Sequence, residues 1–106
     1  MENKSAILLN EHFENQLTIG GEFAYVVLEY NASTGYHWEY RPDNSGTVEL
    51  VEVISLHPST KATGVPGKMC WKFKAERAGR GSILFELYPP GKSDLVAHIC
   101  YKVMVK

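Results

Sequence analysis

Alternation of apolar and polar side chains dominates this chain, and it predicts β-strands rather than helices. The clearest case is Lys68 to Glu76, where every second residue is apolar and lysines fill most positions between. Such alternation is typical of an antiparallel strand with one face in a core and the other in water. The residues expected to point inward are Met69, Trp71, Phe73 and Ala75. No window shows a sustained helical repeat.

Further segments carry strand patterns, and residues typical of turns separate them. The segments are Ala6 to Leu9, Glu22 to Tyr30, Tyr36 to Arg41, Thr47 to Leu56, Ser82 to Tyr88 and His98 to Lys106. In the third of these, the inward positions fall on Tyr36, Trp38 and Tyr40. The pattern slips register near Leu50-Val51, which predicts a β-bulge. Six or seven strands bounded by turns predict an all-β fold, an immunoglobulin-like antiparallel β-sandwich of about seven strands.

Length and composition limit the possible partners. The 106 residues have room for one domain, residues 1–106, around a single two-layer core. Apolar residues make up 44% and charged residues 22%, as in a soluble globular protein. The net charge is -1 and the eleven basic residues are scattered, so we expect no nucleic acid partner. No apolar run approaches membrane-spanning length, so we expect no membrane contact. We also expect a monomer.

The amino terminus and the cysteines indicate an intracellular protein. The apolar stretch Ala6 to Leu9 is too short for the core of a signal peptide, so we expect a cytoplasmic location. There Cys70 and Cys100 would be reduced thiols. Both lie on the parity opposite the inward aromatic residues, so the disulfide of antibody domains is not expected. Asn31-Ala-Ser is a glycosylation sequon, and a glycan on Asn31 would cover the loop that it begins.

Residue types that carry catalysis or bind metals are dispersed. The histidines stand singly at His12, His37, His57 and His98. The two cysteines lack the paired spacing of a zinc site. Asp43 and Asp94 both fall in predicted loops, and no pair of carboxylates stands out. We therefore predict that the protein is not an enzyme and uses no metal or other cofactor.

Three loops are expected at the same end of the sandwich, where such folds usually bind their partners. These loops are Asn31 to Gly35, His57 to Gly67 and Pro89 to Leu95. Each contains Gly, Pro or Asn, which restrict a loop and lower the entropy lost on docking. The same residues also build ordinary turns, with an Asx-turn at Asn31 and a positive φ at Gly35. The pattern alone leaves both interpretations open.

Two of these loops carry motifs of a known family. Asn31-Ala-Ser-Thr-Gly-Tyr-His-Trp38 resembles the Asn-Pro-Thr-Thr-Gly-(Tyr or Phe)-x-Trp motif of the chagasin-type inhibitors of papain-family cysteine peptidases. Gly64-Val-Pro-Gly67 is similar to the glycine-rich loop of that family. The similarity extends over the whole chain in length, strand order and loop placement. Ala32 replaces the usual proline, and Tyr88-Pro89-Pro90-Gly91 stands where the family has Arg-Pro-Trp.

The resemblance implies a reversible inhibitor whose three loops enter the active-site cleft of a papain-like peptidase without being cleaved. Ser33, Thr34 and Gly35 would approach the catalytic centre, because small side chains fit a narrow cleft. Val65, Pro66 and Tyr88 would add apolar contacts on either side. The implied peptidase-binding residues are Asn31, Ser33, Thr34, Gly35, Tyr36, Gly64, Val65, Pro66, Gly67, Tyr88, Pro89 and Pro90.

Two other functions are compatible with a β-sandwich. One is an adhesion or scaffold domain that binds a protein partner through a sheet edge, and the other is a small enzyme with an unrecognised site. An edge binder should have an uncharged edge strand without proline, whereas the final strand carries Lys102 and Lys106.

Overall fold

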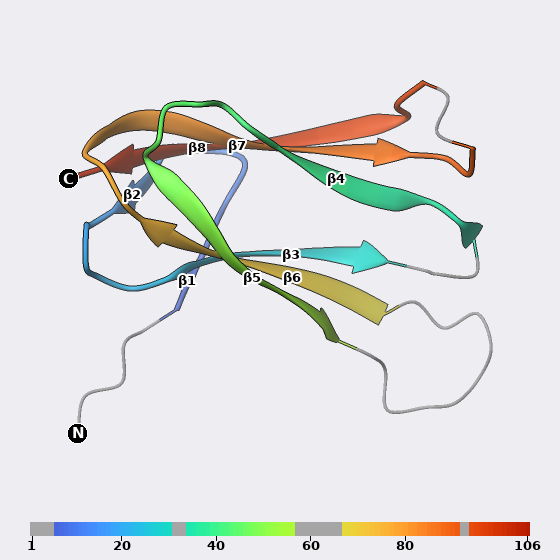
Figure 1. The fold of residues 1–106 in the computed structure, drawn as a ribbon, viewed down its shortest axis with the longest axis horizontal. Helices are drawn as coiled ribbons and strands as arrows, with labels where there is room; N and C mark the ends of the chain where they lie inside the picture. Colours follow the sequence, from blue (N-terminus) through green and yellow to red (C-terminus); the bar gives the residue numbers. More distant parts are fainter. Residues whose placement is uncertain (1–5, 31–33, 57–66, 92–93) are drawn as a thin grey trace.

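The computed structural model describes residues 6–30, 34–56, 67–91 and 94–106. Two four-stranded sheets lie face to face, with the orders β1-β3-β6-β5 and β2-β8-β7-β4 (Figure 1). The strands are β1 (Ile7–Leu8), β2 (Asn15–Leu17), β3 (Ala24–Tyr30), β4 (His37–Pro42), β5 (Val48–Leu56), β6 (Gly67–Ala75), β7 (Gly79–Tyr88) and β8 (Ala97–Val105). This architecture confirms the predicted all-β sandwich.

The amino-terminal segment differs from the sequence prediction. It forms two short strands, of which β1 pairs in parallel with β3 and β2 in parallel with β8, so the sandwich is not wholly antiparallel. Strand β2 has three residues, which are too few for an alternation of apolar and polar residues to be recognised in the sequence. Polar contacts hold it instead, because the buried Asn15 side chain donates to the carbonyls of Lys102 at 2.8 Å and Asn10 at 3.0 Å.

Each segment with a predicted strand pattern contains an observed strand. The register of β5 against β6 shifts between Leu50 and Glu52, which confirms the predicted bulge. The strand expected at Ser82 begins earlier, at Gly79. The inward placement of Tyr36 is wrong, because Tyr36 precedes β4 and its side chain is 41% exposed.

The final strand is an edge over only part of its length. Strand β2 pairs with β8 at Val103 to Val105, so the residues from Ala97 to Lys102 have a strand partner only in β7. The longer strands at the edges of the two sheets are β5 and β4. Strand β5 carries Glu49, Glu52 and the bulge, and β4 carries Arg41 and Pro42. Charges, proline and bulges all disfavour pairing with another chain.

Aromatic side chains from both sheets meet in the core. On β6, Trp71 and Phe73 are buried as the alternation predicted. Phe85 of β7 lies among four other aromatic rings, with centroid distances of 4.6 Å to Trp71, 5.7 Å to Tyr40, 6.3 Å to Tyr101 and 6.4 Å to Phe73. Aromatic pairs of this kind each contribute about 0.5–1.5 kcal/mol beyond the area they bury. The cluster gives the loops a rigid support.

The two cysteines are free thiols, as the sequence predicted. Cys70 is nevertheless buried, although it lies on the outward parity of β6. Its register partners on the neighbouring strands are Val27 and Ile54, so an apolar row crosses the outer face of this sheet. Burial raises the pKa of the Cys70 thiol, which makes it a poor nucleophile.

Candidate functional site

The strand ends that flank the three loops lie at one end of the sandwich, on the right in Figure 1. Tyr30 at the end of β3 pairs with Gly67 at the start of β6, and His37 at the start of β4 pairs with Tyr88 at the end of β7. This register confirms the predicted placement. We call residues 31–36 the first loop, 57–66 the second and 89–96 the third. The proposed site residues outside the described residues are Asn31, Ser33, Gly64, Val65 and Pro66.

The described part of the first loop is exposed and has a defined backbone. Thr34, Gly35 and Tyr36 are all exposed to solvent. The Tyr36 amide donates to the Thr34 hydroxyl at 3.3 Å, and Gly35 has a φ of 79°, as predicted. A side chain on Gly35 would also clash, since an added Cβ would lie 2.8 Å from Cγ of Pro90. Glycine is therefore required here for two independent reasons.

A hydrogen bond of the Trp38 side chain explains why the motif of the first loop ends in tryptophan. Its indole N–H donates to the carbonyl of Glu29 at 3.1 Å. Glu29 belongs to β3 in one sheet and Trp38 to β4 in the other, so this bond joins the two sheets where the loop leaves them. The separation of the loop's two ends is thereby fixed, which limits the conformations of the loop.

The third loop follows Tyr88, the last residue of β7, and contacts the first loop. The Tyr88 ring stacks on His37 with a centroid distance of 6.0 Å and an angle of 27° between the ring planes. Pro90 lies against Gly35. At the far side of the loop, the Val96 amide donates to the Leu87 carbonyl at 2.8 Å. Among the predicted site residues, the structure thus brings Pro90 against Gly35 and places Tyr88 beside them on His37. Gly67 lies in the other sheet, paired with Tyr30 of β3.

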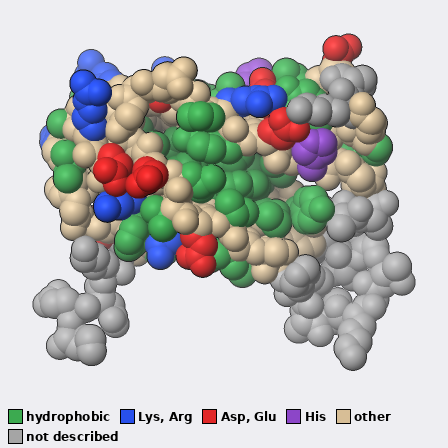
Figure 2. Space-filling view, viewed as in Figure 1, with side chains coloured by type: hydrophobic (Ala, Val, Ile, Leu, Met, Phe, Trp, Pro, Cys, Tyr) green, Lys and Arg blue, Asp and Glu red, His purple; other side chains and the backbone are tan. Residues whose placement is uncertain are grey.

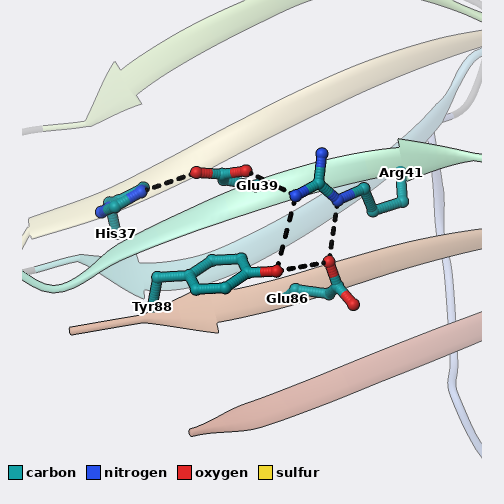
Figure 3. Close-up of polar contacts among 5 residues, drawn as sticks. All are labelled: His37, Glu39, Arg41, Glu86 and Tyr88. Carbon is teal, nitrogen blue, oxygen red and sulfur yellow. Dashed lines mark hydrogen bonds and ion pairs between the residues drawn. The ribbon is translucent and has the colours of Figure 1, made fainter. Parts of the chain in front are cut away.

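A chain of charged side chains continues from the two loops along β4 and β7 (Figure 3). His37 Nε2 lies 2.8 Å from a carboxylate oxygen of Glu39, and Arg41 donates to the other oxygen at 2.9 Å. Arg41 Nε also donates to Glu86 at 2.8 Å. The Tyr88 hydroxyl donates to the same Glu86 oxygen at 3.0 Å and lies 3.5 Å from Arg41 Nη2. Arg41, Glu86 and Tyr88 thus form a closed ring of polar contacts, and Glu39 and His37 extend from it. We call these five residues the charged circuit.

The charges in this circuit support one another. The hydrogen bond from Arg41, followed by that from Tyr88, lowers the pKa of Glu86. The bond to Glu86, followed by that to Tyr88, raises the pKa of Arg41. Both groups therefore stay charged at neutral and mildly acidic pH. Glu39, Arg41 and Glu86 were not among the predicted site residues. The alternation places them on the outer face of their strands, but only the register of β4 against β7 reveals that they meet.

An open apolar hollow of about 380 Å³ lies between the two sheets near the first loop. Its lining comprises Tyr30, His37, Trp38, Ser55, Met69 and Trp71. Figure 2 shows hydrophobic side chains gathered on this side of the molecule, between β4 and β5. Alternation along single strands could not predict the hollow, because it depends on the spacing of two edge strands.

Within the described ranges, no group of three His, Cys, Asp or Glu side chains could hold a metal ion. In the same part of the chain, no helix is long and apolar enough to cross a membrane.

Comparison with known proteins identifies the class to which this fold and its loops belong. Residues 18–105 match the family described as chagasin family peptidase inhibitor I42. A search of curated protein sequences gives no significant match. The structure is similar to the crystal structure of the cysteine protease inhibitor EhICP2 from Entamoeba histolytica, with 21% identity, a TM-score of 0.74 and coverage of 95% of this chain and 96% of that one.

Two further structures have the same fold. The solution structure of amebosin has 22% identity and a TM-score of 0.71, with 95% of this chain and 96% of that chain covered. The structure of PbICP-C in complex with falcipain-2 has 21% identity and a TM-score of 0.60, with 100% of this chain and 96% of that chain covered. The chain described here belongs to the chagasin family of peptidase inhibitors. It is an inhibitor and not an enzyme.

Proposed function

We propose that this protein inhibits papain-family cysteine peptidases by inserting the first, second and third loops into the active-site cleft. The observation that carries the proposal is the exposed segment Thr34-Gly35-Tyr36, held between fixed strand ends at the end where all three loops leave the sandwich. Family membership supports the same conclusion. So does PbICP-C, a protein of the same fold whose structure was solved in complex with falcipain-2.

The described residues of the first loop suit a narrow cleft. Gly35 has no side chain, so the backbone can approach a catalytic centre closely, and Thr34 beside it is small. The fixed stems prevent the loop from relaxing into an extended substrate with an aligned scissile carbonyl, and cleavage requires that alignment. The peptidase is therefore blocked by a loop that it does not cut. Such a complex should bury on the order of 1,600 Å² in total.

An inhibition assay tests the proposal directly. The protein is titrated into a papain-like peptidase with a fluorogenic peptide substrate, and a serine peptidase and a metallopeptidase serve as controls. We expect competitive, reversible inhibition with a Kd of roughly nanomolar order, as in many protease–inhibitor pairs. The inhibitor should remain intact after long incubation, as mass spectrometry would show. If several papain-like peptidases are unaffected at micromolar concentration, the proposed function is wrong.

Binding through a sheet edge is the other function considered from the sequence. The edge strands β4 and β5 carry charged residues, a proline and a bulge, which disfavour addition of a strand from a partner. Strand β5 also exposes Val51, Val53 and Leu56, so its charges and its bulge are the features that argue against this alternative.

A further inference from the structure

The third loop departs most from the family pattern, and its contacts in the free protein suggest a second role for it. Tyr88 and Pro90 both touch residues of the first loop or of the strand that follows it. Interface energy in protein complexes is often concentrated in Arg and Trp, and this loop lacks both. Among its described residues, Pro90 lies against Gly35 of the chain's own first loop.

The contact between the loops has two tiers. In the outer tier, the Pro90 ring lies so close to the Gly35 backbone that an added Cβ would be 2.8 Å from Cγ and 3.2 Å from Cβ of the proline. In the inner tier, Tyr88 stacks on His37, its register partner across β4 and β7. The two tiers touch the first loop at Gly35 and immediately after it, at His37, on either side of Tyr36.

Polar contacts with Glu86 and Arg41 of the charged circuit fix the position of the Tyr88 side chain. Figure 3 shows its hydroxyl directed toward Glu86 and Arg41. Arg41 pairs with Leu84 in the register and so lies further from the loops than Glu39 or His37. The hydroxyl therefore points away from the loop end, back along the sheet. The guanidinium carbon of Arg41 also lies 6.0 Å from the centre of the Tyr88 ring. The ring and hydroxyl are thus engaged before any peptidase binds.

Pro89 and Pro90 make the third loop stiff, because each proline fixes its own φ near -65°. A stiff segment that rests on a second loop restricts the conformations of that loop. Restriction before binding raises affinity, since less conformational entropy is lost in the complex.

We propose that the third loop is a brace for the first loop: Tyr88 and Pro90 hold Gly35 to His37 in the binding conformation, and Arg41 and Glu86 are positioning residues that fix Tyr88. Only the effect of the brace on peptidase binding rests on the proposed function. The contact between the loops exists in the free protein and can be tested without a peptidase.

Arg41→Met tests the brace through a residue remote from the loop tips. It removes the charge and the hydrogen bonds while keeping an unbranched side chain. Arg80→Met is the matched control, because Arg80 is an exposed arginine at the start of β7 whose partner is Glu14 at 3.2 Å. Amide hydrogen exchange of Gly35, Tyr36 and His37 is measured in the free proteins. We expect exchange at these amides to be about fivefold faster in Arg41→Met and unchanged in Arg80→Met.

Binding kinetics give the second readout. If the first loop must find its binding conformation, a looser brace reduces the competent fraction, so the association rate falls while the dissociation rate is little changed. We expect about fivefold slower association for Arg41→Met, with no further loss when Tyr88→Phe is added. A residue that touches the peptidase would instead raise the dissociation rate.

The two readouts separate the possible failures. Unchanged exchange at Gly35 to His37 in Arg41→Met would overturn the brace. Additive losses from Arg41→Met and Tyr88→Phe, seen in the dissociation rate, would also overturn it and assign Tyr88 to the interface. If the parent protein inhibits no papain-like peptidase, the proposed function fails, whereas the exchange experiment still decides whether the brace exists.

Discussion

The two ends of this sandwich are held together in different ways. At the end opposite the three loops, the turn after β4 is tied by hydrogen bonds. Asp43 accepts from the amide and hydroxyl of Ser45 at 3.0 and 2.8 Å and from the amide of Ser82 at 2.7 Å. Thr47 is buried, and its carbonyl accepts the Glu76 amide at 2.8 Å. This turn is locked to both sheets.

At the loop end, ring contacts and a charged circuit hold the strand ends, while Thr34 to Tyr36 stay exposed. At the opposite end, the polar groups of the turn thus form hydrogen bonds within the protein. At the loop end, the strand ends are held in place while Thr34 to Tyr36 stay accessible. If the proposed function is correct, stability and recognition depend on opposite ends of the strands. Substitutions at the loop end should alter inhibition without unfolding the protein, and substitutions at the opposite end should do the reverse.

Thr34→Asp should have the largest effect. It would place a carboxylate inside the peptidase cleft without a compensating partner, so inhibition should weaken by at least about 100-fold. The thermal unfolding temperature should not change, because Thr34 is exposed. Thr34→Ser is the control and should inhibit nearly as well as the parent. If Thr34→Asp inhibits like the parent protein, the first loop is only a turn.

Gly81→Ala should give the next largest effect, at the opposite end. An added Cβ would collide with Oγ1 of Thr47 and lie 2.7 Å from Oγ of Ser45. We expect a loss of about 2 kcal/mol in the free energy of unfolding, measured by urea denaturation. Inhibition by the folded protein should be unchanged. A reduced affinity at full folding would show that the two ends are coupled.

Asp43→Asn should have a smaller effect that depends on pH. Burial alone would raise the pKa of Asp43, but hydrogen bonds from Ser45 and Ser82 outweigh it and lower the pKa below its ordinary value. The charged form therefore stabilises the fold fully above the unfolded-state pKa, and this stabilisation is lost as the pH falls through the folded-state pKa. For this exposed group we expect a loss of about 1 kcal/mol at pH 7.

Urea denaturation of the parent and of Asp43→Asn across the pH range would test this sign. The difference between the two proteins should be constant above about pH 5 and should shrink below about pH 4. A difference that grows as the pH falls would contradict the assigned hydrogen bonds.

Arg80→Met should have the smallest effect. Its ion pair with Glu14 is exposed, and such pairs contribute about 0–1 kcal/mol. We expect a change of less than about 0.5 kcal/mol in the free energy of unfolding, measured by urea denaturation and abolished at high salt. A larger loss would mean that the ends of β2 and β7 depend on this contact.

The sequence predicted those parts of the molecule that depend on alternation and on turn residues. The class of fold, the bulge near Leu50, the common end of the loops and the positive φ of Gly35 were all predicted and are confirmed. Each follows from residues close together in the chain. The roles of the individual site residues in binding stay predictions.

Features that depend on pairing between distant strands could not be predicted. Tyr88 and Arg41 meet only because β4 and β7 are neighbours in a given register. Cys70 is buried because Val27 and Ile54 flank it from other strands. The side-chain amide of Asn15 in β2 donates to the carbonyl of Lys102 in β8, and no hydrophobic pattern within three residues could reveal that contact.

The parallel pairing of β2 with β8 has a consequence for how the chain is made. Asn15 bonds to Lys102, which is 87 residues away, so a strand near the beginning of the chain must wait for the last one. Closing such a long segment is entropically costly and slows folding. At a synthesis rate of about 5–20 residues per second, several seconds separate the two segments. Strand β2 can therefore pair in its native position only after β8 has left the ribosome.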